Sequence, residues 1–172
     1  MKKVSNLGYN CNIARSRVDF LFNPEKEIAD FADFEKEYNT HATRFINAVF
    51  KSIKPIKVNR IGFVIQYFIA DNNQTETIKK KFVSKDLEDL RDLSIRFNKN
   101  NLVGDLKIND ITNIQTGMIT KNNKEDRGIL IQRDFNNIVR TGNALAITSL
   151  KKLLKKAYSY STKRFIEEVV LN

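Results

Sequence analysis

The chain has 172 residues, with 30 Lys and Arg, 20 Asp and Glu, one His, one Cys and a net charge of +10. A single Cys and a single His cannot build a structural zinc site, and one Cys cannot form a disulfide within the chain. No stretch approaches the ~18 apolar residues of a membrane-spanning helix, and we expect a cytoplasmic protein. The length is that of one ordinary domain, which we expect to cover residues 1–172.

The first predicted elements are a strand and a long helix. Polar and apolar side chains alternate over residues 12–22, which is typical of a half-buried strand. Asn23 and Pro24 suit the start of a helix. From there apolar residues recur at spacings of three and four until Pro55, which predicts an amphipathic helix over residues 24–53.

The middle of the chain predicts a strand and then an ambiguous segment. Residues 57–70 carry apolar side chains on both faces, which is typical of a central strand covered on both sides. Residues 71–74 indicate a turn, and residues 75–83 fit either the return strand of a hairpin or the start of a helix. Ser84 is a candidate cap for a short helix that reaches Leu93.

The last third predicts strands followed by a second long helix. The strand-like segments are residues 93–97, 104–120 and 128–139, and the polar residues 121–126 suit a hairpin tip. An apolar stripe from Ile147 to Val169 predicts the helix. The pattern therefore indicates an α+β fold, an antiparallel sheet of about five to six strands with two long helices packed on one face.

Two resemblances bear on the class of protein. The Phe-rich helix that leads through a turn into Arg60, Ile61, Gly62 and Tyr67 resembles a sporadically distributed family of uncharacterised bacterial proteins. Their comparable strand has the form Arg-Ile/Val-Gly-Leu-Arg-Tyr-Ile-Asn, and here Val64 replaces the second Arg. The run of antiparallel strands before a C-terminal helix is similar to the SecB-like export and toxin–antitoxin chaperones, although the helix at 24–53 departs from their pattern. Both resemblances imply a binding or accessory protein and carry over no catalytic residue.

Candidate catalytic residues are few. His41 lies at the edge of the predicted apolar helix face without a triad signature, and Cys11 precedes the first strand without a Cys–His signature, so we interpret both as structural. Asp92, Asp105 and Lys107 are similar to the acid…acid-x-Lys arrangement of metal-dependent nucleases, but we interpret them as outward charges on a strand, because the motif lacks its context. We expect no enzyme activity, no metal ion and no cofactor.

The basic C-terminal helix is the strongest charge feature, because residues 131–172 hold 8 basic and 3 acidic groups. The candidate anion-binding or partner-binding residues are Lys151, Lys152, Lys155, Lys156, Lys163, Arg164, Arg15 and Arg17, and Arg133 and Arg140 are candidates to extend the patch. Such a surface can bind phosphates, an acidic protein or anionic lipid, although a solvated face of a core helix fits as well. The 20 Lys, 20 Asn and 19 Ile also suggest an AT-rich gene, which weakens the total charge as an indicator.

The leading functional hypothesis is a non-enzymatic protein that acts through a protein–protein contact, at a sheet edge or at the apolar groups of residues 58–70. A bacterial toxin–antitoxin, phage-defence or phage-encoded system is the setting that the resemblances imply, and a homo-oligomer is compatible with it. The alternative is a nucleic-acid-binding protein that uses the basic C-terminal helix.

Overall fold

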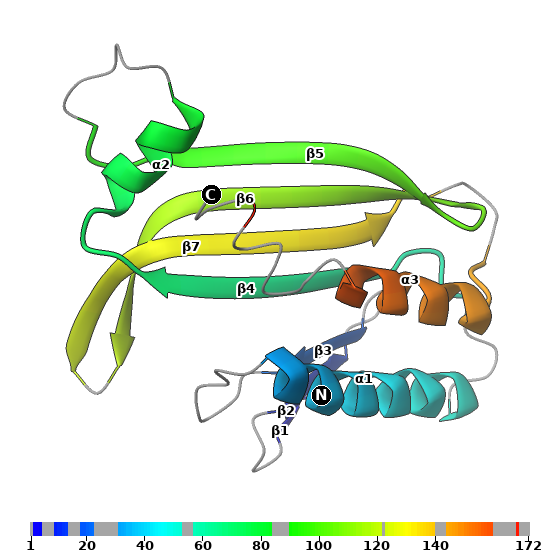
Figure 1. The fold of residues 1–172 in the computed structure, drawn as a ribbon. Coiled ribbons are helices and arrows are strands. Elements are labelled where there is room, and N and C mark those ends of the chain that lie inside the picture. Colours follow the sequence, from blue (N-terminus) through cyan, green and yellow to red (C-terminus); the bar gives the residue numbers. More distant parts are fainter. Residues whose placement is uncertain are drawn as a thin grey trace. The chain divides into compact units, whose positions relative to one another are not determined.

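The fold was analysed in a computed structural model of the chain. It describes residues 2–4, 9–13, 18–22, 31–52, 57–83, 90–121, 123–139, 144–159 and 168. These residues form helices and antiparallel strands, so the α+β class is confirmed (Figure 1). Two compact units, residues 1–56 and 57–172, are described one at a time. The expectation of a single domain stays a prediction.

The first unit contains a three-stranded sheet and a long helix. Strands β1 (Lys2–Val4), β2 (Tyr9–Ile13) and β3 (Val18–Phe22) pair in that order, all antiparallel. Helix α1 (Phe31–Ser52) lies within the predicted helical region, and its Phe45 ring stacks on Phe20 of β3 with centroids 4.6 Å apart. The single strand predicted over residues 12–22 is wrong in part, because residues 12 and 13 end β2 and residues 18–22 form the separate strand β3, which pairs with it.

The second unit is built on a four-stranded antiparallel sheet. Its strands are β4 (Gly62–Ala70), β5 (Ser94–Val103), β6 (Leu106–Lys121) and β7 (Lys124–Asn137), in the order β4-β7-β6-β5 (Figure 1). The predicted single sheet of five to six strands with two long helices on one face is therefore not confirmed. The described strands are divided between two sheets.

Two hairpins link β5 to β6 and β6 to β7. Gly104 has a φ of 63° at the first central position of the two-residue loop Gly104-Asp105, which is where a type II′ turn requires a residue with positive φ. Asn123, with a φ of 62°, lies between the paired residues Lys121 and Lys124. The second hairpin tip thus lies inside the predicted loop 121–126.

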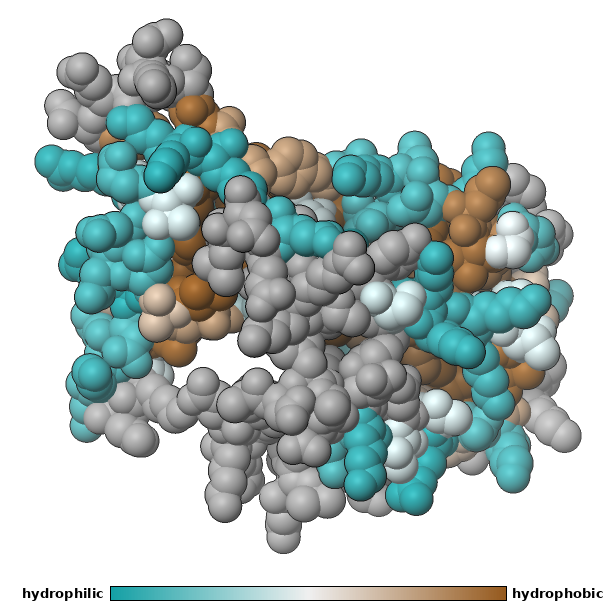
Figure 2. Space-filling view, viewed as in Figure 1, coloured by the Kyte–Doolittle hydropathy of each residue, from teal (hydrophilic) through white to brown (hydrophobic). Residues whose placement is uncertain are grey.

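One face of the four-stranded sheet forms the core of this unit. Directly opposed residues share a face, so the register identifies the buried set. Its most buried members are Phe63, Ile65, Ile108, Ile114, Ile129, Ile131 and Phe135. In Figure 2 hydrophobic residues gather in a strip that descends from α2 across this sheet.

The described residues of this unit also form two α-helices. Residues 75–83, ambiguous in sequence, form most of helix α2 (Gln74–Phe82), because Asp71 accepts hydrogen bonds from the Asn73 N–H (2.7 Å) and the Thr77 hydroxyl (2.6 Å) and so starts a helical turn. Phe82 contacts Phe97 of β5, with ring centroids 5.6 Å apart. Helix α3 (Ile147–Ser159) buries Leu150, Leu153, Leu154 and Ala157. The predicted short helix after Ser84 falls mostly outside the described residues, and 90–93 are not helical.

A buried ion pair joins the two central strands. Nη2 of Arg133 on β7 lies 3.0 Å from both carboxylate oxygens of Asp110 on β6, and the two residues are 3% and 7% exposed. The Arg133 guanidinium carbon also lies 4.5 Å from the centroid of the Phe135 ring. The proposed extension of the basic patch by Arg133 is therefore wrong, because this cation is buried and neutralised.

Removing the carboxylate of Asp110 should destabilise the protein strongly. Asp110→Leu leaves a buried guanidinium without its counter-charge, which should cost about 3–5 kcal/mol of unfolding free energy. The double variant Asp110→Leu with Arg133→Met should recover most of that loss, since two apolar side chains need no partner. Urea unfolding followed by circular dichroism measures both. A loss below about 1 kcal/mol for Asp110→Leu alone would contradict a role for the pair.

Candidate functional site

Strand β4 lies at the edge of the four-stranded sheet and presents unpaired backbone groups. Asn137 N–H donates to the Ile61 carbonyl (3.3 Å), and Asp71 N–H donates to the Arg127 carbonyl (3.0 Å). Residues of odd number therefore direct their backbone groups towards β7, and the even ones direct theirs away from it. The residues with outward N–H and C=O groups are Gly62, Val64, Gln66, Phe68 and Ala70. Within the described chain these outward groups have no hydrogen-bond partner.

The β4 edge carries no charge. None of the residues Gly62–Ala70 is acidic or basic, although 29% of the whole chain is charged. Val64 is 53% exposed, and the Gln66 side chain donates to Gln132 of β7 (3.0 Å) on the solvent-facing side of the sheet. Proteins commonly protect an edge strand with Lys, Pro or a bulge, and an unprotected edge is a template for another strand.

The prediction that β4 is a central strand covered on both sides is wrong. It rested on apolar residues at both odd and even positions of 58–69. In the structure Phe63 and Ile65 are buried, while Val64 and Gln66 are exposed on the other face. Apolar composition on two faces cannot tell an edge strand from a central one.

The segment before β4 is held by Asn137, the last residue of β7. This side chain is 3% exposed and makes two hydrogen bonds, donating to the Asn59 carbonyl (2.9 Å) and accepting from the Ile61 N–H (2.7 Å). Leu145 N–H then donates to the Val58 carbonyl (2.6 Å), which ties the same segment to the approach to α3. The amide of Asn137 therefore continues the β4–β7 ladder by one step beyond the sheet.

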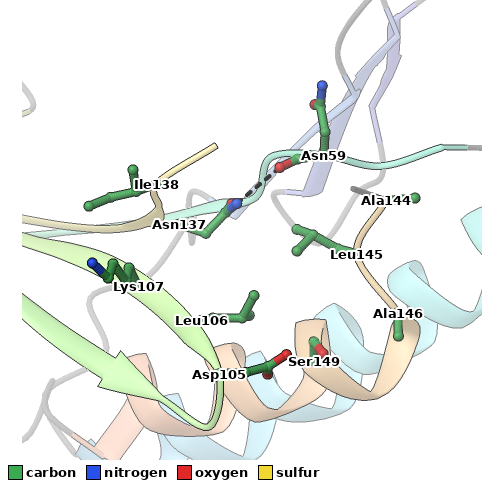
Figure 3. Close-up of a pocket in the computed structure, with 10 residues that line it drawn as sticks. All are labelled: Asn59, Asp105, Leu106, Lys107, Asn137, Ile138, Ala144, Leu145, Ala146 and Ser149. Carbon is green, nitrogen blue, oxygen red and sulfur yellow. Dashed lines mark hydrogen bonds between the residues drawn. The ribbon is translucent and has the colours of Figure 1, made fainter. Parts of the chain in front are cut away.

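A pocket of about 300 Å³ lies beside this junction (Figure 3). Figure 3 shows side chains from the segment before β4, the β5–β6 turn, the end of β7 and the start of α3. The polar residues that line the pocket include Asn59, Asp105, Lys107 and Ser149. The buried Asn137 side-chain amide makes its hydrogen bonds to backbone groups, so at this residue the pocket wall serves to hold the fold. No group of three His, Cys, Asp or Glu able to hold a metal ion occurs in the described part of the chain.

The described residues include only some of the candidate anion-binding residues. Lys151, Lys152 and Lys155 are exposed on α3, opposite its buried leucines, and Lys156 is half-buried. Lys163, Arg164, Arg15, Arg17 and Arg140 lie outside the described residues. The structure thus brings three of the predicted cations together on one helix face.

The nuclease-like residues do not converge. Asp92 precedes β5 and Asp105 follows it, so a strand of 10 residues separates them. At about 3.3 Å per residue the two carboxylates lie roughly 30 Å apart, too far to share a metal ion. His41 Nε2 is 3.3 Å from Glu37 Oε2 one helical turn away, and Cys11 lies in β2 opposite Phe20. The interpretation of both residues as structural stays a prediction.

Comparison with known proteins assigns no family, because no protein-family model and no curated protein matches the chain. Among the described residues no helix is both long enough and apolar enough to cross a membrane. Sequence reasoning missed the position of β4 at the sheet edge. No local signal could have identified it, because an uncharged, largely apolar run such as Ile61 to Ala70 is more typical of a central strand.

Asn137→Asp should destabilise the junction of β4 with the rest of the sheet. A carboxylate accepts from the Ile61 N–H but cannot donate to the Asn59 carbonyl, and it places a charge at a position that is 3% exposed, so unfolding free energy should fall by about 1–3 kcal/mol. Asn100→Asp, at an exposed position of β5, is the matched control and should change it by less than about 0.5 kcal/mol. Equal losses of unfolding free energy for the two variants in urea unfolding would show that the Asn137 hydrogen bonds do not contribute measurably to stability.

Proposed function

We propose that this chain is a non-enzymatic binding protein that acts through a protein–protein contact, and that the contact is strand addition at the β4 edge. The observation that carries the proposal is the row of outward backbone groups at Gly62, Val64, Gln66, Phe68 and Ala70 on an uncharged edge. In this mode backbone hydrogen bonds supply affinity, and side chains at alternate positions supply specificity.

The preferred partner for this edge is a second copy of the chain. If two β4 strands pair antiparallel about Gln66, Val64 faces Phe68 of the other copy, Ile65 faces Tyr67, Phe63 faces Ile69 and Gly62 faces Ala70. Each row then joins residues of similar polarity on the same face, and the two Gln66 amides meet beside their Gln132 partners. Two copies of a chain with a charge of +10 repel each other least where neither presents a charge.

A charge placed at Gln66 should control this self-association. Gln66→Lys or Gln66→Glu alone sets like charges against each other at the two-fold axis and should weaken the dimer at least about tenfold, while an equimolar mixture of the two variants should restore it. Sedimentation equilibrium over a range of concentrations measures this. Asn98→Lys and Asn98→Glu, at the middle of the other edge, are the controls. An unchanged dimerisation affinity for both Gln66 variants would overturn the proposed register.

Blocking one backbone group of β4 should have the same effect without adding charge. Gln66→Pro removes an outward N–H and leaves the β4–β7 ladder intact, as proline is tolerated on the open side of an edge strand. Self-association should fall at least about tenfold, because two hydrogen bonds are lost per dimer. Asn98→Pro on the β5 edge should leave it unchanged. Circular dichroism of each variant shows whether the fold persists.

Nucleic-acid binding by α3 is the second candidate, because Lys151, Lys152 and Lys155 are exposed together on one helix face. Replacing the three with Gln should reduce the slope of log affinity against log salt for a nonspecific DNA duplex by about 3. Gln at Lys57, Lys80 and Arg91 removes the same charge from exposed sites elsewhere and serves as the control. Identical slopes for both triple variants, or no DNA binding at low salt, would remove this candidate.

The cellular setting in a toxin–antitoxin, phage-defence or phage-encoded system, including a SecB-like chaperone role, rests on the sequence resemblances alone and stays a prediction.

A further inference from the structure

Strand β5 forms the other edge of the four-stranded sheet, and among the described residues no strand pairs with its outer side. Its hairpin closes on the pair Val103 and Leu106, and Thr116 N–H donates to the Leu93 carbonyl (3.0 Å), so odd residues of β5 bond to β6. The residues with outward N–H and C=O groups are Ser94, Arg96, Asn98, Asn100 and Leu102. All five are exposed, and Leu102 is 66% exposed.

The two edges differ in charge. β5 contains Arg96 and Lys99 and no acidic residue, whereas β4 contains neither basic nor acidic residues. Arg96 lies on the solvent-facing side of the sheet and Lys99 on the other, both are exposed, and within the described chain neither makes an ion pair. A strand added to β5 would therefore meet one cation on each face, three positions apart.

A second copy of the chain does not suit β5. Antiparallel self-pairing about Asn98 would place both Arg96 and both Lys99 side chains within two residues of the symmetry axis. In that register the two Lys99 side chains are diagonal neighbours on the same face and repel each other, and no acidic residue of β5 compensates them. The two basic side chains thus act against self-pairing while leaving the edge open to a strand of opposite charge.

We propose that the β5 edge binds an extended acidic segment of another polypeptide by strand addition, with carboxylates three residues apart facing Arg96 and Lys99. In antiparallel pairing an apolar residue of the segment lies opposite Leu102. The backbone bonds come from Ser94, Arg96, Asn98, Asn100 and Leu102. This site is separate from the β4 contact and can be occupied whether or not β4 is paired.

The test uses the full chain and a fluorescein-labelled peptide, VTTETTETT, whose two Glu align with Lys99 and Arg96 when its Val faces Leu102. Fluorescence anisotropy at low salt should show saturable binding, and the peptide VTTQTTQTT should bind about tenfold more weakly. Arg96→Gln combined with Lys99→Gln should remove the preference for Glu. Asn98→Pro should weaken binding at least about tenfold by removing a central backbone donor.

Two controls separate this site from other sources of binding. Gln66→Pro on β4 and the triple Gln variant of Lys151, Lys152 and Lys155 on α3 should both leave binding of the acidic peptide unchanged. Binding that survives Asn98→Pro, or that disappears with the α3 variant, would overturn the proposal in favour of attraction to the basic helix. Equal binding of the Glu and Gln peptides would overturn the charge selectivity, and no binding at all would overturn the site.

Discussion

Every backbone N–H and C=O in a sheet needs a partner, and within the described part of the chain β4 is hydrogen-bonded on one side only, to β7. That constraint fixes which backbone groups face β7 and which face outward, since the bond between Asn137 N–H and the Ile61 carbonyl sets the parity of the whole strand. The outward groups from Gly62 to Ala70 have no partner strand among the described residues. A partner strand can satisfy them without rearranging the sheet, and both proposed contacts use this property of an open edge.

The interior of the sheet keeps these edges in place. Arg133 and Asp110 join the two central strands through a buried ion pair, and an ion pair in that position favours one register because a shifted register would leave a buried charge unpaired. Asn137 extends the β4–β7 ladder into the preceding segment. Gly128 lets β4 approach closely, since a Cβ atom there would lie 2.6 Å from Phe68 Cζ and would overlap the Ile69 backbone.

Periodicity in the sequence identified the α+β class, the region of α1, the hairpin near Asn123 and the apolar face of α3, because these depend on local spacing. It did not identify the division of residues 12–22 into paired strands or the edge position of β4, since strand order depends on contacts between distant residues. Arg133 was assigned to a surface patch, yet it follows Ile129 and Ile131 at inward positions of β7. Its partner Asp110 becomes visible only when the β6–β7 register is known. The exposed lysines of α3 were predicted correctly as a helix face, and their role stays a prediction.

Amide hydrogen exchange, resolved residue by residue at two protein concentrations, tests the central claim most directly. The outward N–H groups of Val64, Gln66 and Phe68 should exchange rapidly in dilute solution and become protected at high concentration, while the inward N–H groups of Ile65 and Ile69 should be protected at both. The same outward groups exchanging at equal rates at both concentrations would contradict pairing at the β4 edge.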